Sequence, residues 1–204
     1  MPHMNADAAW LTAEISHLTA SGNLNVVMAC HDYSAGMHAL CLFDRLFYRP
    51  ESKIPPGAQS IWKFDMLGIA ALREIAVQEG AAADLVIIST HASEGLPNAV
   101  KIWMNAWTER HNGRPGALVL ILDDFVHHVL NPSSVEFFVQ ERAKRAGMTF
   151  VVHKSDGRHA FEDFERAANP EKRARTFANF RENLLAGAVE QFHQWSAGNE
   201  KQHV

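Results

Sequence analysis

Side chains that could carry out chemistry are concentrated directly after short apolar segments of this sequence. The candidates are His31, Asp32, Ser34, Gly36, His38, Thr90, His91, Ser93, Glu94, Gly95, Asp123, Asp124 and His127. Imidazoles and carboxylates can transfer protons or ligate a metal, whereas hydroxyls and the backbone amides of glycine-containing turns can bind a phosphate. These residue types predict a ligand site, provided that the fold brings the segments together.

Five short apolar segments are predicted to be β-strands, and they span residues 24–30, 61–67, 84–89, 117–122 and 148–153. Helical spacing of apolar residues falls between them, in residues 35–47, in residues 70–79 before Gly80, after Pro97, and from Pro132 to Gly147. Residues 50–57 hold three of the eight prolines and are predicted to form a loop.

Strands that alternate with helices form a parallel sheet with helices on both faces. Five strands suit the order 2-1-3-4-5, in which the second strand lies at an edge. Residues 61–67 alternate apolar with charged side chains, as an edge strand does, and we expect the other four strands to be buried on both faces. Ligands of such sheets bind beyond the carboxyl ends of the strands, where the strand order reverses. The candidate residues therefore meet at one edge of the sheet.

Residues 84–107, DLVIISTHASEGLPNAVKIWMNAW, resemble the third strand, loop and helix of flavodoxin-like proteins, including the NADPH-dependent flavin reductases. The unit from Leu122 to Gly147 is similar to the one that follows the fourth strand of that family, where an acid and an aromatic residue come after the strand. The resemblance covers residues 24–155. It implies an α/β, flavodoxin-like three-layer sandwich with a five-stranded parallel sheet.

The same resemblance implies bound FMN and a flavin-linked redox function, either electron transfer or NAD(P)H-dependent reduction of a flavin or quinone. Ser34, Gly36 and a protonated His38 would then hold the flavin phosphate. The segment from Thr90 to Gly95 and the loop from Asp123 to His127 would flank the flavin ring. In the first loop, however, Tyr33, Met37 and His38 replace the hydroxyl residues of the family.

Two alternatives stay open. Because the first loop departs from the family pattern, the chain could be a cofactor-free interaction or regulatory module of the same fold. A phosphoacceptor receiver is disfavoured, since no Asp ends the third strand. The second alternative is a metal-dependent hydrolase, whose ligands would come from a mixed set of imidazoles and carboxylates: His31, Asp32, His91, Asp123, Asp124 and His127. Neither a dinucleotide fingerprint, nor a P-loop, nor a nucleophile elbow is present.

Composition narrows the classes further. The 204 residues include 19 Lys and Arg and 23 Asp and Glu, which gives a formal net charge of −4. A net negative charge does not indicate binding to nucleic acid. No apolar run approaches the roughly 18 residues that span a bilayer, and no signal peptide is apparent, so we expect a cytoplasmic protein whose partner is a small molecule. Cys30 and Cys41 are expected to be buried and unpaired.

The two ends of the chain are predicted to add helices to a single domain of residues 1–204. One helix spans residues 5–21, and the other spans residues 170–197 with a stripe of aromatic residues that includes Phe192 and Trp195. This second helix is longer than the sheet is deep, because about 27 Å of helix faces about 20 Å of strand. Its last turns therefore either pack on the first helix or form the seam of a homodimer.

Overall fold

The structure is a computed structural model, and it describes residues 24–47, 56–91, 95–123 and 133–155. Its elements are β1 (Leu24–Cys30), α2 (Tyr33–Phe47), β2 (Pro56–Lys63), η1 (Met66–Gly68), α3 (Ala70–Ala82), β3 (Leu85–His91), α4 (Asn98–Arg110), β4 (Ala117–Asp123), α5 (Ser133–Ala146) and β5 (Thr149–Ser155). The predicted helices 5–21 and 170–197 and the predicted dimer seam lie outside the described residues.

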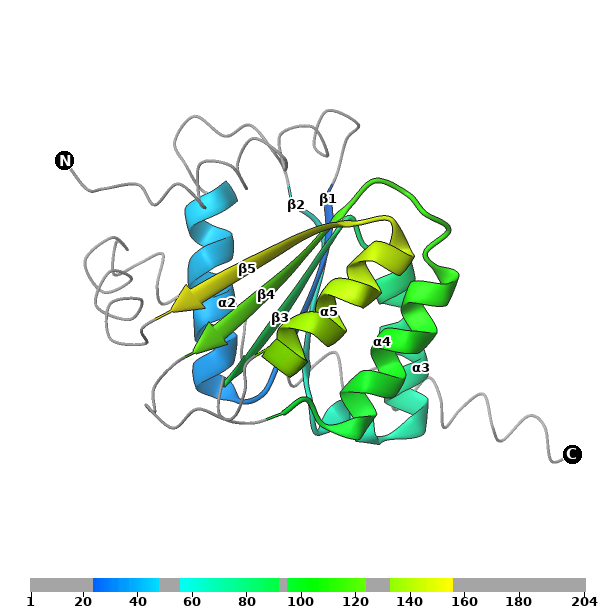
Figure 1. Cartoon of the computed structure of the whole chain (residues 1–204), viewed down its shortest axis with the longest axis horizontal. Coiled ribbons are helices and arrows are strands. Elements are labelled where there is room, and N and C mark those ends of the chain that lie inside the picture. The colour runs from blue at the N-terminus through cyan, green and yellow to red at the C-terminus, as the bar shows by residue number, and fades with distance from the viewer. Residues whose placement is uncertain (1–23, 48–55, 92–94, 124–132, 156–204) are drawn as a thin grey trace, which may run out of the picture.

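The strands form one parallel sheet in the order β2-β1-β3-β4-β5, as the sequence predicts. Helix α2 lies on one face of the sheet, and α3, α4 and α5 lie on the other (Figure 1). This is the doubly wound, flavodoxin-like arrangement, in which the order reverses between β1 and β3. The carboxyl ends of these two strands therefore flank the predicted site.

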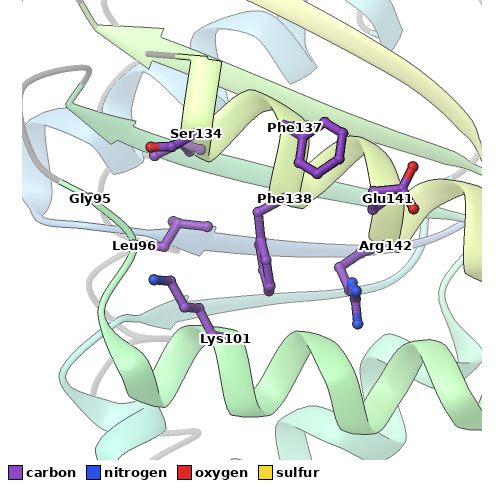
Figure 2. Close-up of a pocket in the computed structure, with 9 residues that line it drawn as sticks. Gly95, Leu96, Lys101, Ser134, Phe137, Phe138, Glu141 and Arg142 are labelled. Carbon is purple, nitrogen blue, oxygen red and sulfur yellow. The ribbon is translucent and has the colours of Figure 1, made fainter. Parts of the chain in front are cut away.

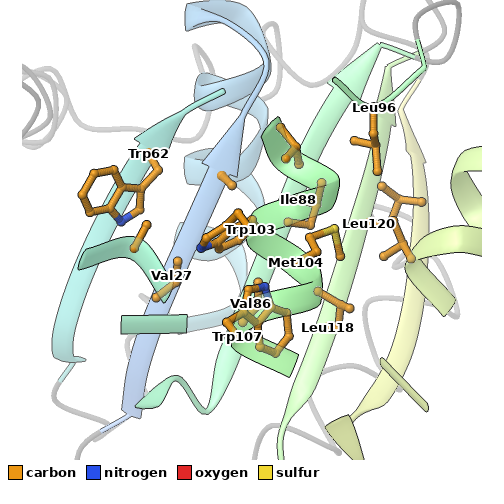
Figure 3. Close-up of a cluster of buried hydrophobic side chains, with 14 of the residues drawn as sticks. Val27, Trp62, Val86, Ile88, Leu96, Trp103, Met104, Trp107, Leu118 and Leu120 are labelled. Carbon is orange, nitrogen blue, oxygen red and sulfur yellow. The ribbon is translucent and has the colours of Figure 1, made fainter. Parts of the chain in front are cut away.

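The largest core lies between the sheet and helices α3, α4 and α5 (Figure 3). Trp103 and Trp107 of α4 are fully buried there, with ring centroids 6.0 Å apart, over Val86 of the central strand. Because indole rings of this size fill most of the space between helix and sheet, they fix the position of α4 relative to β3. Pro97 directly precedes this helix as its N-cap residue. The helical spacing after Pro97 predicts one stripe of Val100, Trp103, Ala106 and Trp107; Ala106 is half-buried and the other three are fully buried.

The second strand is shifted toward the N-terminus from its predicted place. It starts at Pro56, inside the predicted loop, and ends at Lys63 instead of Leu67. The alternation of Trp62 and Phe64 does reflect burial of one face, since both are less than 5% exposed. Beyond Phe64 the chain turns into η1, in which the Leu67 amide donates to the Phe64 carbonyl at 3.2 Å. Periodicity of two residues cannot tell a strand from such a short turn.

The fifth strand also differs from its prediction. Phe150 and Val152 are only half-buried, because β5 is the second edge of the sheet and only β4 pairs with it. Cys30 and Cys41 are buried, as expected, and neither is in a disulfide. Burial, together with the nearby charge of Asp32, raises the pKa of the Cys30 thiol to about 12, so Cys30 is not a nucleophile near neutral pH.

Helix α3 does not end at Gly80 as predicted; it continues to Ala82, and Gly80 is buried inside it. The absence of a side chain at Gly80 allows α3 to pack closely against Trp107 of α4. A Cβ at this position would lie 2.9 Å from Cγ of Trp107, closer than carbon atoms approach one another. In contrast, Gly147 does end α5, with a φ of +71° that suits glycine.

We therefore expect Gly80→Ala to destabilise the protein by about 1–3 kcal/mol, although alanine is the better helix former. The added methyl group has to displace the buried indole of Trp107. Urea unfolding followed by circular dichroism measures the loss. Gly68→Ala is the matched control, because a Cβ at Gly68 meets no atom within 4 Å. Equal stability of the two variants would contradict this packing role.

Candidate functional site

The turn between β1 and α2 is very short. Only His31 and Asp32 separate the last residue of β1 from the first residue of α2. The His31 amide donates to the carbonyl of Ser89 at 2.9 Å, so this residue still follows the line of the sheet. The carboxylate of Asp32 accepts a hydrogen bond from the Ala35 amide at 2.9 Å, and this makes Asp32 the N-cap of α2.

His91 is the last residue of β3, and its imidazole reaches across the point of strand reversal to Asp32. Its Nε2 lies 2.9 Å from Oδ2 of Asp32. The ring of His31 lies beside that of His91, with 5.2 Å between centroids, and packs edge-on against Phe64 at 5.6 Å. The three residues His31, Asp32 and His91 are called the switch-point cluster below. An aspartate that holds one nitrogen of an imidazole orients the ring and selects its tautomer.

Opposing effects act on the pKa of Asp32. Burial raises it, but the hydrogen bonds from the Ala35 amide and from His91, with the charges of the two histidines, outweigh burial and lower the pKa overall. The carboxyl is therefore ionised throughout the neutral range. A negative charge at the N-terminus of a helix is also favoured by the helix dipole.

This shift makes a prediction for pH dependence. A carboxyl whose pKa is lowered on folding adds stability above its unfolded pKa of about 3.9, and that stability is lost as pH falls through the lower folded value. We expect Asp32→Asn, which retains an N-cap oxygen, to unfold about 0.5–1 kcal/mol more easily than the native chain near pH 6, because Asp32 is half-exposed and its ion pair is partly screened.

Urea unfolding at several pH values between about 6 and 3 measures this difference, which should shrink toward the acid end. Asp65→Asn is the control, since Asp65 is an exposed carboxylate whose ion pair among the described residues is with Lys63, at 3.5 Å. A difference between Asp32→Asn and the native chain that does not change with pH would rule out the charged pair.

The residues after β1 do not fit a flavin phosphate. The predicted site needs free amide donors at the start of α2, but the carboxylate of Asp32 caps that end of the helix. Ser34 is exposed in the first turn, Gly36 is buried in the helix, and His38 is only 6% exposed, more than one turn from the helix start. An ionised carboxylate where the phosphate should sit repels a dianion.

The structure describes only some of the other predicted site residues. Thr90 and His91 belong to β3 itself instead of the following loop, and His91 pairs in register with Asp123 at the end of β4. The side chain of Thr90 is fully buried, and its hydroxyl has no hydrogen-bond partner in the described part of the chain. Gly95 is exposed. Ser93, Glu94, Asp124 and His127 lie outside the described residues.

A metal centre does not emerge from the residues that the structure describes. No group of three His, Cys, Asp or Glu side chains among them is placed to hold an ion. Nε2 of His91 lies 2.9 Å from a carboxylate oxygen of Asp32. The geometry of the described residues therefore does not support the hydrolase alternative.

Sequence reasoning included Asp32 among metal ligands and missed its pairing with His91. One local signal was available. An Asp directly before a helix is a typical N-cap, and it would have moved the predicted helix start from residue 35 to Tyr33. The pairing with His91 carries no sequence signal, because the two residues are 59 positions apart.

The fold assignment rests on the order of the strands in the sheet, because the comparisons with known proteins give only a distant similarity. No family model and no curated protein matches the sequence. Among solved structures, the Trp repressor binding protein from Bacillus subtilis is similar at 9% identity and a TM-score of 0.40, over 64% of this chain and 81% of that one. A likeness this distant carries no functional argument. Within the described residues, no helix is both long and apolar enough to cross a membrane.

Proposed function

We propose that the chain is a flavin-independent binding module of the flavodoxin-like fold, and that the switch-point cluster recognises its ligand or partner. The observation that carries this proposal is the carboxylate of Asp32 at the N-terminus of α2. It accepts from an amide donor that a phosphate would use, and it places a negative charge where a phosphate would place its own. Among the functions that the sequence leaves open, this geometry favours the cofactor-free module.

The chemistry of the cluster suits recognition of a small polar group. Asp32 holds the ring of His91 in one orientation, and His31 adds a second imidazole at a centroid distance of 5.2 Å. The side chain of His91 is 21% exposed and that of Asp32 is 47% exposed. A polar group arriving at this edge would therefore meet a carboxylate and two rings that can donate or accept hydrogen bonds.

The test is a titration with FMN and, separately, with riboflavin, followed by flavin fluorescence and by the visible absorbance bands. We expect no change up to about 100 µM of either flavin. Asp32→Ser is the informative variant, because it removes the charge and retains a hydroxyl N-cap. A gain of FMN or inorganic phosphate binding in this variant alone would support the role of Asp32. Stoichiometric FMN binding by the native chain would overturn the proposal.

A flavin-linked redox function is the second candidate, and one observation favours it. At the end of β3, the buried Thr90 hydroxyl lacks a hydrogen-bond partner among the described residues, and Gly95 has open space around it. Backbone and hydroxyl groups of this loop would flank a flavin ring, and the flavin would supply the electron chemistry. Binding of riboflavin as tight as that of FMN would favour this candidate with a ring site and no phosphate site.

A further inference from the structure

Helices α4 and α5 enclose a groove that the sequence does not predict. Its volume is about 330 Å³, and its described walls include Leu96, Lys101, Phe138, Glu141 and Arg142 (Figure 2). The ring of Phe138 projects from α5 into the space between the two helices. Gly95 and Leu96, which directly precede Pro97 and α4, also line the groove.

Two cations stand on either side of this aromatic ring. The ammonium group of Lys101 lies 6.0 Å from the centroid of Phe138, and the guanidinium carbon of Arg142 lies 5.1 Å from it. Within the described part of the chain, neither cation forms an ion pair with a carboxylate. Glu141 is the acidic residue among the groove's described lining. The groove thus combines an aromatic wall with an excess of positive charge.

Arg142 also has an unused donor. Its terminal Nη1 donates to the side-chain oxygen of Asn105 on α4, but its Nε is buried and has no hydrogen-bond partner among the described residues. A buried donor that loses its water without gaining a partner costs free energy. An anionic acceptor that reaches a terminal nitrogen of this guanidinium would form a charge-assisted hydrogen bond with it.

Both helices carry an exposed large apolar side chain. Phe137 of α5, which lines the groove, is 64% exposed, and Ile102 of α4 is 44% exposed. Large apolar side chains left in water near a cavity are typical of binding surfaces. The volume lies at the small end of ligand pockets, roughly 300–1,000 Å³, and it suits a single ring with a short acidic group better than a folded partner.

We infer that the groove between α4 and α5 binds a small aromatic carboxylate, with the ligand ring against Phe138 and the carboxylate at the guanidinium group of Arg142, while the ammonium group of Lys101 adds attraction at longer range. The inference stands apart from the proposed function, since it uses no residue of the switch-point cluster. The ring would stack or pack edge-on against Phe138. The carboxylate would accept from a terminal nitrogen of the Arg142 guanidinium and attract the ammonium group of Lys101.

The test uses phenylacetate and its neutral isostere, phenylacetamide, as probes in nitrogen-15 NMR titrations of the full chain. We expect phenylacetate to shift amide signals of α4 and α5 and to bind at least about tenfold more tightly than the amide. Lys101→Gln, at an exposed position, should weaken phenylacetate several-fold. Arg142→Lys, which keeps the charge but removes the planar set of guanidinium donors, should weaken it as well.

Lys63→Gln is the control, because it removes one positive charge from β2, at the opposite edge of the sheet. It should leave the affinity unchanged. Thermal unfolding of each variant separates loss of binding from loss of fold. Equal affinity for acid and amide, shifts confined to other elements, no binding at about 20 mM, or no effect of either groove variant would each overturn the inference.

Discussion

Val86→Asp is expected to abolish folding or to lower the free energy of unfolding by more than about 4 kcal/mol. Val86 is fully buried in the middle of the central strand, where it pairs in register with Val27 of β1 and Leu118 of β4. The indole rings of α4 cover it from the helix side. A carboxylate at this position has no partner and no water, and small domains have only about 5–15 kcal/mol of stability to lose.

The matched control is Val152→Asp, which makes the same change on the same face of the sheet. Val152 lies on the edge strand β5 and is only half-buried, so its carboxylate can reach water and the loss should be clearly smaller. Val86→Ala tests the site in a variant that still folds, with an expected loss of about 1–3 kcal/mol. Thermal and urea unfolding measure all three. A Val86→Asp protein that melts within a few degrees of the native chain would show that the described core is wrong.

His111→Leu should cost about 1–3 kcal/mol of stability, because a buried carbonyl group beside the ring loses the imidazole N–H as its donor. His111 directly follows α4 and is fully buried. Its Nδ1 lies 3.0 Å from the Ala146 carbonyl at the end of α5, and its Nε2 lies 3.2 Å from the Ala83 carbonyl after α3. One imidazole therefore contacts the backbone at the carboxyl ends of α3 and α5 from its own position at the end of α4.

Leucine fills a similar volume, so the loss reports the hydrogen bonds more than a cavity. His111→Gln provides the comparison, since its amide can still donate to one of the two carbonyls, and we expect it to recover part of the stability. Urea unfolding of both variants at one pH gives the difference. If the leucine variant lost less than about 0.5 kcal/mol, the two carbonyl contacts would contribute nothing to the fold.

Much of the architecture could be predicted from the sequence, because the local spacing of apolar and charged residues indicates which faces of an element are buried. The charge-poor segments at residues 24–30, 84–89 and 117–122 predict strands covered on both faces, and all three lie inside the sheet. The alternation around Trp62 places the second strand at the edge. Alternation of strands with helices then leaves few topologies, since crossovers between parallel strands are right-handed.

Element ends were predicted less well where a distant residue decides them. Gly80 looks like a helix terminator in the sequence, but the indole of Trp107, which needs the space of a missing side chain, keeps it within α3. The start of β2 at Pro56 depends on pairing with Leu24 of β1, which outweighs the local preference of proline for a loop. Neither contact produces a recognisable sequence pattern within a few residues of the helix or strand end that it determines.

The candidate site shows the same division. The sequence alone determined that polar residues follow each buried strand, and a parallel sheet gathers the ends of its strands at one edge whatever the loops contain. Only the tertiary structure decided that Asp32 both caps α2 and holds His91, that His111 joins Ala83 to Ala146, and that Phe138 lies between Lys101 and Arg142. The physical reason is distance along the chain. Hydrophobic periodicity reports which face of an element is buried, whereas a hydrogen bond or a cation beside a ring depends on the register between elements that are tens of residues apart.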